Sequence, residues 1–151
     1  MADIFMNTRL KIDISEVCKN FPAVVAAYLF GSHAKGVVSS LSDVDIGFYF
    51  NYALVPSKEI RSALAYDLRE ALAKALHTGE AIDVVSLNDA PPLLLREVVY
   101  KGALVFTEDK AKQVHFESWA IAQWLDWKWY EDQFNKAILD NIGKPILRYA
   151  E

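Results

Sequence analysis

Two acidic residues separated by a single residue, Asp43 and Asp45, interrupt an apolar run, and their carboxylates could together bind a cation. Successive side chains on a strand point to opposite faces, so the two carboxylates are predicted to share one face, with Val44 turned the other way. Like charges this close raise the pKa of one carboxyl group unless a cation is bound. Because Mg²⁺ takes carboxylate and phosphate oxygens together, the pair favours a metal-bound phosphate.

A Gly-Ser pair, Gly31-Ser32, follows another apolar run, and ten residues separate it from Asp43. Glycine lets a backbone approach a ligand closely, and Ser32 brings a hydroxyl and an N–H to a predicted helix start, where anions bind. The alternative is a polar turn between two strands without chemistry. Spacing and flanking strands together favour a site where phosphate and metal meet.

This pattern resembles the signature of the polymerase-beta-like nucleotidyltransferases, especially the minimal nucleotidyltransferases (MNT) of HEPN/MNT toxin–antitoxin pairs. The resemblance covers about residues 20 to 107 and implies an α/β (α+β) fold with helices packed on a mixed sheet. It implies three catalytic and metal-binding carboxylates, with Mg²⁺ or Mn²⁺ as the ion: Asp43, Asp45 and Asp83. It also implies nucleotide-binding roles for Gly31, Ser32, Ser42 and Lys35.

The motif departs from its relatives at two positions. Where many relatives read Gly-Ser-Arg-Ala-Arg-Gly, this chain has His33 and Lys35 in place of the arginines. Lys35 keeps a positive charge without the bidentate geometry of arginine, and His33 is expected to be a turn residue that faces solvent. Ser42 either orients Asp43 or caps the turn.

Asp83 lies within a predicted strand, residues 81–87. An acid in an apolar strand is costly unless it is paired, so one alternative is an edge position facing solvent or an arginine such as Arg96. Its place after a strand, helix and strand matches the third carboxylate of the resemblance.

The spacing of apolar residues predicts the remaining elements of an α/β unit with a mixed sheet. The run from Val24 to Phe30 suits a strand inside a sheet rather than at its edge. A long helix is predicted from a Ser57 cap to about His77, with Gly79 as its terminator. The other predicted elements are helices at about 14–20 (capped by Asp13 or Ser15) and 93–100, and a strand at 103–106.

Residues 108–151 form a helical extension that the motif does not explain, beyond a nucleotidyltransferase domain at 1–107. Thr107 is the predicted cap of one long helix, or of two helices with a bend. This segment holds all four tryptophans, in two adjacent apolar stripes. Trp and Tyr are enriched at interfaces, so we expect a surface for a partner or for self-association, in a homo-oligomer or hetero-oligomer.

Composition narrows the class of protein. At 151 residues the chain fits one domain with an extension, and a net charge of −4 makes nucleic acid an unexpected main partner. Cys18, the single cysteine, is expected in the core and excludes an internal disulfide. Without a signal-like start or a membrane-length apolar run, the chain is expected to be cytoplasmic, with no membrane partner.

Together these features predict an enzyme that transfers a nucleoside monophosphate. The resemblance implies AMP transfer from ATP to a tyrosine of a cognate HEPN ribonuclease toxin, which neutralises the toxin. Two alternatives stay open: a small-molecule nucleotidyltransferase of the aminoglycoside type, and an antitoxin that acts by binding alone.

Overall fold

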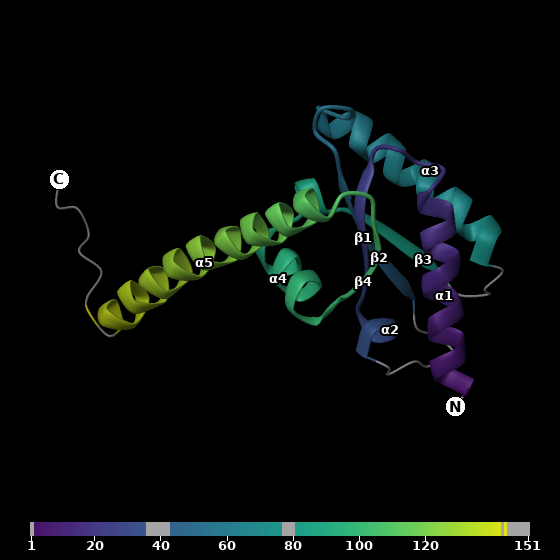
Figure 1. Cartoon of the computed structure of the whole chain (residues 1–151). Coiled ribbons are helices and arrows are strands. Elements are labelled where there is room, and N and C mark those ends of the chain that lie inside the picture. The colour runs from purple at the N-terminus through teal and green to yellow at the C-terminus, as the bar shows by residue number, and fades with distance from the viewer. Residues whose placement is uncertain (1, 36–42, 77–80, 143, 145–151) are drawn as a thin grey trace.

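A four-stranded mixed sheet with helices on both faces forms the body of the molecule (Figure 1). The computed structural model describes residues 2–35, 43–76, 81–142 and 144. Their elements are α1 (Ala2–Cys18), β1 (Val24–Phe30), α2 (Ser32–Lys35), β2 (Val44–Phe50), α3 (Lys58–Leu76), β3 (Ile82–Ser86), the 3-10 turn η1 (Leu87–Asp89), α4 (Pro92–Lys101), β4 (Ala103–Thr107) and α5 (Lys110–Asn141).

The strand order is β3-β2-β1-β4, so β1 lies inside the sheet as its continuous apolar run predicts. β1 pairs antiparallel with β2 and β4, whereas β3 pairs parallel with β2 through the α3 crossover. The predicted mixed sheet is confirmed, and β3 and β4 are its edges.

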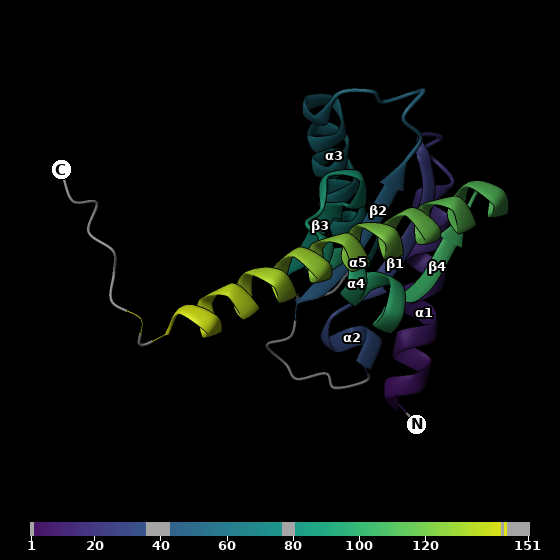
Figure 2. The ribbon, with the colours of Figure 1, turned by 90° about the vertical axis from the view of Figure 1, so that its left-hand side faces the viewer.

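Alternating side chains of the strands fill two hydrophobic cores. On one face, Val44, Ile46 and Phe48 of β2 pack with α1 and α3. On the other face, Val25 and Tyr28 of β1 pack with α4 and the first turns of α5. Figure 2 shows α5 and α4 in front of the sheet, with α1 behind it. Because both faces are covered, the two central strands can be apolar on each side.

The N-terminal helix is longer than the sequence analysis expects. A helix was expected only from about residue 14, with Asp13 or Ser15 as its cap, but α1 begins at Ala2 and those residues lie inside it. Buried Leu10, Ile14 and Val17 form one stripe at helical spacing, and this stripe continues the helix through the expected cap. Cys18 is buried as predicted, and burial raises the pKa of its thiol to about 12.

The crossover helix α3 matches its prediction closely. Ser57 Oγ accepts a hydrogen bond from the Ile60 N–H at 3.2 Å, which is the expected cap. Leu68, Leu72 and Leu76 are buried and Leu64 is partly buried against them, whereas Ile60 in the first turn of α3 is exposed. Gly79 lies outside the described residues.

Within its described residues the C-terminal extension is one continuous helix, Lys110–Asn141, so one helix rather than two spans this range. Asp109 caps it by accepting a hydrogen bond from the Lys112 N–H, whereas the expected cap, Thr107, is the last residue of β4. Phe116 and Ala120 are buried, and exposed side chains dominate beyond Trp127. The helix has 32 residues, about 48 Å at 1.5 Å per residue, and its distal half extends beyond the body (Figure 1).

No helix within the described ranges combines the length and hydropathy of a membrane span.

Candidate active site

Gly31 and Asp45 meet where β1 ends and β2 begins. Phe30 pairs with Asp45 in the antiparallel register, and Gly31 follows with φ of 68°, a conformation that favours glycine. A Cβ on Gly31 would overlap the Asp45 carboxylate. The glycine is therefore required both by its backbone angle and by the acid beside it.

Asp83 lies directly across from Asp45. The parallel register of β2 and β3 pairs these two residues, and neighbouring strands lie about 4.8 Å apart. In-register residues share a face of the sheet, so both carboxylates point to the α4 side. Asp83 is exposed, and Arg96, its alternative partner, instead contacts Glu97 and the ring of Trp124.

Asp43 is the third negative charge near Asp45 and Asp83. We call these three carboxylates together with Gly31 the acid end of the sheet. Burial raises the pKa of Asp45 first, and the neighbouring Asp83 and Asp43 charges raise it further. His33 acts in the opposite direction. Like charges held together without a compensating partner favour a cation at this end of the sheet.

His33 is buried, so the expectation that it faces solvent is wrong. The short helix α2 tucks its side chain inward between β1, β2 and α1, and Asn7 Nδ2 donates a hydrogen bond to the His33 carbonyl at 3.4 Å. Its effect on the pKa of Asp45 shows that it belongs to the electrostatic surroundings of the acids.

The remaining motif residues are placed only in part. Ser32 begins α2 directly after Gly31 and is half-buried. Lys35 ends α2, but its side chain is not described, and Ser42 lies outside the described residues. The predicted nucleotide-binding role of these four residues therefore stays a prediction.

The acid end fits a divalent ion by its chemistry. Hard cations prefer carboxylate oxygens, and three carboxylates from two adjacent strand starts face one region. Within the described part of the chain, no three His, Cys, Asp or Glu side chains already form a metal-ligand group. Because Asp43 and Asp83 are exposed, their side chains can rotate to complete one.

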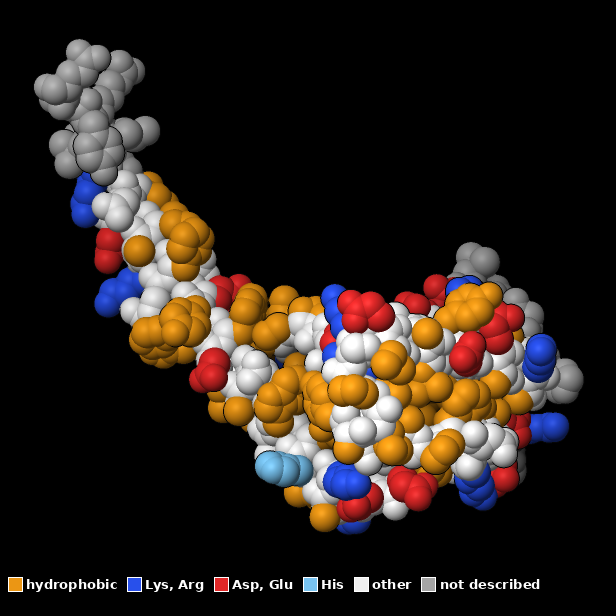
Figure 3. Space-filling view, turned by 90° about the horizontal axis from the view of Figure 1, so that it is seen from above, with side chains coloured by type: hydrophobic (Ala, Val, Ile, Leu, Met, Phe, Trp, Pro, Cys, Tyr) orange, Lys and Arg blue, Asp and Glu red, His pale blue; other side chains and the backbone are white. Residues whose placement is uncertain are grey.

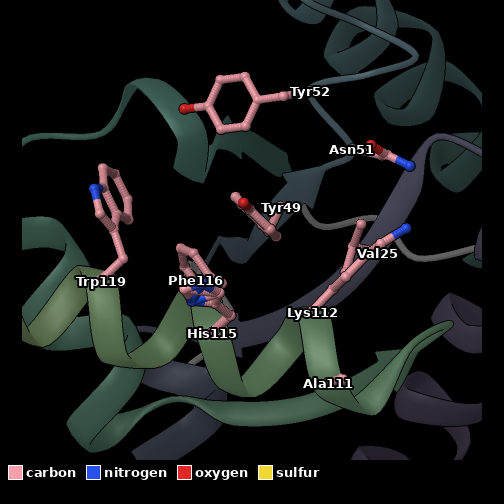
Figure 4. A pocket seen from close by; sticks show the side chains of 9 residues that line it. All are labelled: Val25, Tyr49, Asn51, Tyr52, Ala111, Lys112, His115, Phe116 and Trp119. Atoms are coloured by element: carbon pink, nitrogen blue, oxygen red, sulfur yellow. The ribbon is translucent and has the colours of Figure 1, made fainter.

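The opposite end of β2 is built from aromatic rings, and we call Tyr49, Tyr52, Phe116 and Trp119 the aromatic end. Phe116 of α5 stacks on Tyr49 with ring centroids 4.3 Å apart. These side chains line a cavity of about 530 Å³ together with His115 and Lys112 (Figure 4). The aromatic end anchors α5, because Phe116 is buried between the rings of Tyr28 and Tyr49.

An ion pair beside the aromatic end was not foreseen. Arg61 of α3 donates from Nε and Nη2 to the two oxygens of Asp89, at 2.8 and 2.7 Å, and its guanidinium lies over Tyr52. Hydrogen bonding to Arg61 lowers the pKa of Asp89. Arg61 sits off the Leu64–Leu68 stripe of α3, so periodicity alone assigns it to solvent; no sequence signal identifies its partner.

The fold and the match to a family model together identify the class of protein. The chain belongs to the "Polymerase beta, Nucleotidyltransferase" family, whose model matches residues 13–111. The resemblance seen in the sequence is therefore confirmed at the level of the family and its fold.

Solved structures from toxin–antitoxin systems share this fold. A chain of a toxin–antitoxin structure with AMP-PNP is 23% identical with a TM-score of 0.64, covering 87% of this chain and 97% of that chain. A chain of the tri-AMPylated Shewanella oneidensis HEPN toxin in complex with MNT antitoxin is 22% identical with a TM-score of 0.60, covering 90% and 98%. A chain of an MntA-HepT structure is 21% identical, also at 0.60, covering 89% and 97%. No curated protein sequence matches this chain at a significant level.

Proposed function

We propose that this protein is an antitoxin nucleotidyltransferase that moves AMP from ATP to a tyrosine hydroxyl of a HEPN ribonuclease toxin. The observation that carries the proposal is the acid end, where Asp45 and Asp83 lie in register and Gly31 lies against the Asp45 carboxylate. Structural neighbours that contain AMPylated HEPN toxin and AMP-PNP support this choice of donor and acceptor.

The chemistry is displacement at the α-phosphorus of ATP. The acceptor oxygen forms a bond to that phosphorus, the bond to the oxygen that bridges to the β-phosphate breaks, and pyrophosphate leaves. In this proposal Asp43, Asp45 and Asp83 hold the ion, and Mg²⁺ or Mn²⁺ bound there would stabilise the charge on attacking and leaving oxygens.

Each residue of the site has a separate task. Gly31 and Ser32 approach the terminal phosphates through backbone N–H groups and the Ser32 hydroxyl, and Ser42 and Lys35 assist there. Asp83 is exposed on the edge strand and in this proposal lies nearest the acceptor, so it also accepts the proton from the tyrosine hydroxyl. We also propose that the chain consists of a nucleotidyltransferase domain, residues 1–107, and a helical extension, residues 108–151. The partner binds through the extension.

Labelled ATP tests the proposal directly. The protein is incubated with Mg²⁺ and with α-labelled or γ-labelled ATP, with and without a HEPN protein encoded beside it. We expect label from the α-position only, on the partner, and its loss in Asp43→Asn. Asp67→Asn, an exposed acid on α3, is the matched control and should transfer label like the wild type.

Neutralisation by binding alone is the second candidate, because the distal half of α5 exposes large apolar side chains that binding would cover. If Asp43→Asn and Asp45→Asn both neutralise the toxin at full strength, binding is sufficient and the enzymatic proposal is wrong. Label on an aminoglycoside without any protein partner would instead favour a drug-modifying enzyme.

A further inference from the structure

A groove of about 430 Å³ runs between α3 and the edge strand β3. Its floor is the β3 segment from Asp83 to Ser86, and Asp89 and Pro91 close its far end. Figure 1 shows α3 lying alongside β3, and the two elements are in contact. The groove therefore starts at the candidate third carboxylate and leads away from the acid end.

The floor of this groove offers free backbone hydrogen-bonding groups. β3 pairs with β2 on one side only. The Ala81 carbonyl faces β2, where it accepts from the Val44 N–H at 2.8 Å, so the backbone of Ile82 and Val84 and the N–H of Ser86 point outward. The Ser86 carbonyl belongs to the first turn of η1. Four residues at about 3.3 Å each give a floor of roughly 13 Å, which matches a short extended peptide.

The wall of the groove is one side of α3. Ser62, Ala65, Tyr66 and Arg69 follow each other at intervals that place them on one helix face, beside the buried leucines. Tyr66 and Arg69 are exposed, and among the described residues Arg69 has no hydrogen bond or ion pair. The wall thus presents a ring and an uncommitted cation to whatever lies in the groove.

The far end is rigid and acidic. Asp89 accepts hydrogen bonds from Arg61 and from Ser86 Oγ, the latter at 2.9 Å, which fixes its position. A nucleic acid strand would bring phosphates toward Asp83 and Asp89, which repel them, and among the described lining residues Arg69 alone is a cation. A polypeptide that adds a strand to β3 meets no such repulsion and satisfies the outward backbone groups.

We infer that this groove binds the acceptor protein as an extended segment paired with β3, a proposal that rests on the proposed function. The segment carries its hydroxyl residue next to Asp83 and an acidic side chain opposite Arg69. Pairing with β3 fixes the distance from that hydroxyl to the acid end, so the groove determines which residue of the partner receives AMP. Arg69 is then a positioning residue for the acceptor and makes no contact with the nucleotide.

The first test is transfer from α-labelled ATP to the HEPN protein at increasing concentrations of that protein. Arg69→Glu should raise the KM for the partner about tenfold or more, and leave binding of a fluorescent ATP analogue unchanged. Lys74→Glu, the same change on an exposed lysine of α3 outside the groove, is the control and should leave both unchanged. A KM for Arg69→Glu within twofold of the wild type overturns the proposal.

Hydrogen exchange of the complex provides a test that does not depend on transfer. Partner binding should slow exchange of the outward Val84 N–H in the wild type, and less so in Arg69→Glu at equal partner concentration. If the partner slows exchange of the Val84 N–H but is never labelled itself, the groove proposal is supported and the proposed enzymatic function is wrong. If the partner is labelled, or an aminoglycoside is, while Val84 exchanges as in the free protein, the groove proposal is wrong.

Discussion

The two ends of the sheet differ in whether their charged side chains are paired. The acid end gathers like charges, so the pKa of Asp45 is raised, and His33 offsets this shift only in part. The aromatic end pairs its charges, Arg61 with Asp89, and buries Phe116 between two rings. The comparison teaches that stability is concentrated at one end of β2, which leaves the other end free to hold an arrangement that needs a ligand.

The largest expected effect lies at the aromatic end. Phe116→Ala removes a buried ring and should lower the free energy of unfolding by about 3–5 kcal/mol, measured by urea denaturation. Trp129→Ala, an exposed ring on the same helix, is the control and should change stability by about 0.5 kcal/mol or less. A loss under about 1 kcal/mol for Phe116→Ala would mean that stability is not concentrated there.

The acid end should respond in the opposite way. Asp45→Asn removes a charge from the proposed ion site, so the rate of AMP transfer should fall about 100- to 1000-fold. This fall corresponds to an activation free energy higher by about 2.7–4 kcal/mol. The free energy of unfolding of the metal-free protein should be unchanged or higher, because repulsion from Asp83 and Asp43 is relieved. An Asp45→Asn variant that is clearly less stable than the wild type would contradict the view that the acid end contributes little to stability.

Lowering the pH should change the stability contributed by the two ends in opposite directions. Arg61 lowers the pKa of Asp89 in the folded protein, so the stability it contributes is present above the unfolded pKa of about 3.9 and is lost as pH falls through the folded value. Asp89→Asn should cost about 1.5–3 kcal/mol at pH 7 and less in acid. For Asp45, whose pKa is raised, the wild type should instead gain stability relative to Asp45→Asn as pH falls. Urea midpoints from pH 7 to 3 measure both, and equal slopes would refute the contrast.

The smallest effect is expected where the glycine meets the acid. Gly31→Ala should lower stability by about 1–2 kcal/mol because its φ is 68°, and it should also displace the Asp45 carboxylate. In the double variant with Asp45→Ala the overlap disappears, so the combined loss of stability should be smaller than the sum of the two single losses. Strict additivity would show that the two residues do not interact.

Much of this arrangement was predictable because short-range rules govern it. Alternation on β2 and the turn at Gly31 follow from local stereochemistry, so Asp43 and Asp45 could be assigned from their spacing. The fold class and the place of β1 inside the sheet followed from continuous apolar runs and one crossover. The register that sets Asp83 opposite Asp45 was supplied only by the resemblance, since pairing between distant strands has no local signal.

The errors arose where tertiary contacts override local preference. His33 was expected to face solvent in a turn, but it is buried in α2, next to Asn7 of α1. Asp13 reads as a cap, yet the apolar stripe through Leu10 and Ile14 extends the helix past it. Arg61 and Asp89 are 28 residues apart, and such a pair is visible only once the fold is known.

The distal half of α5 also has a thermodynamic consequence. Beyond Trp127 its side chains are largely exposed, so its helicity depends on intrinsic propensity and on local pairs such as Lys128 with Asp132. Uncovered helical segments of this length are marginal in water. Any molecule that binds this segment therefore also has to offset the conformational entropy that the segment loses when it is held as a helix. Affinity at α5 is thus adjustable by changes in helix propensity alone, far from both ends of the sheet and without altering a single contact.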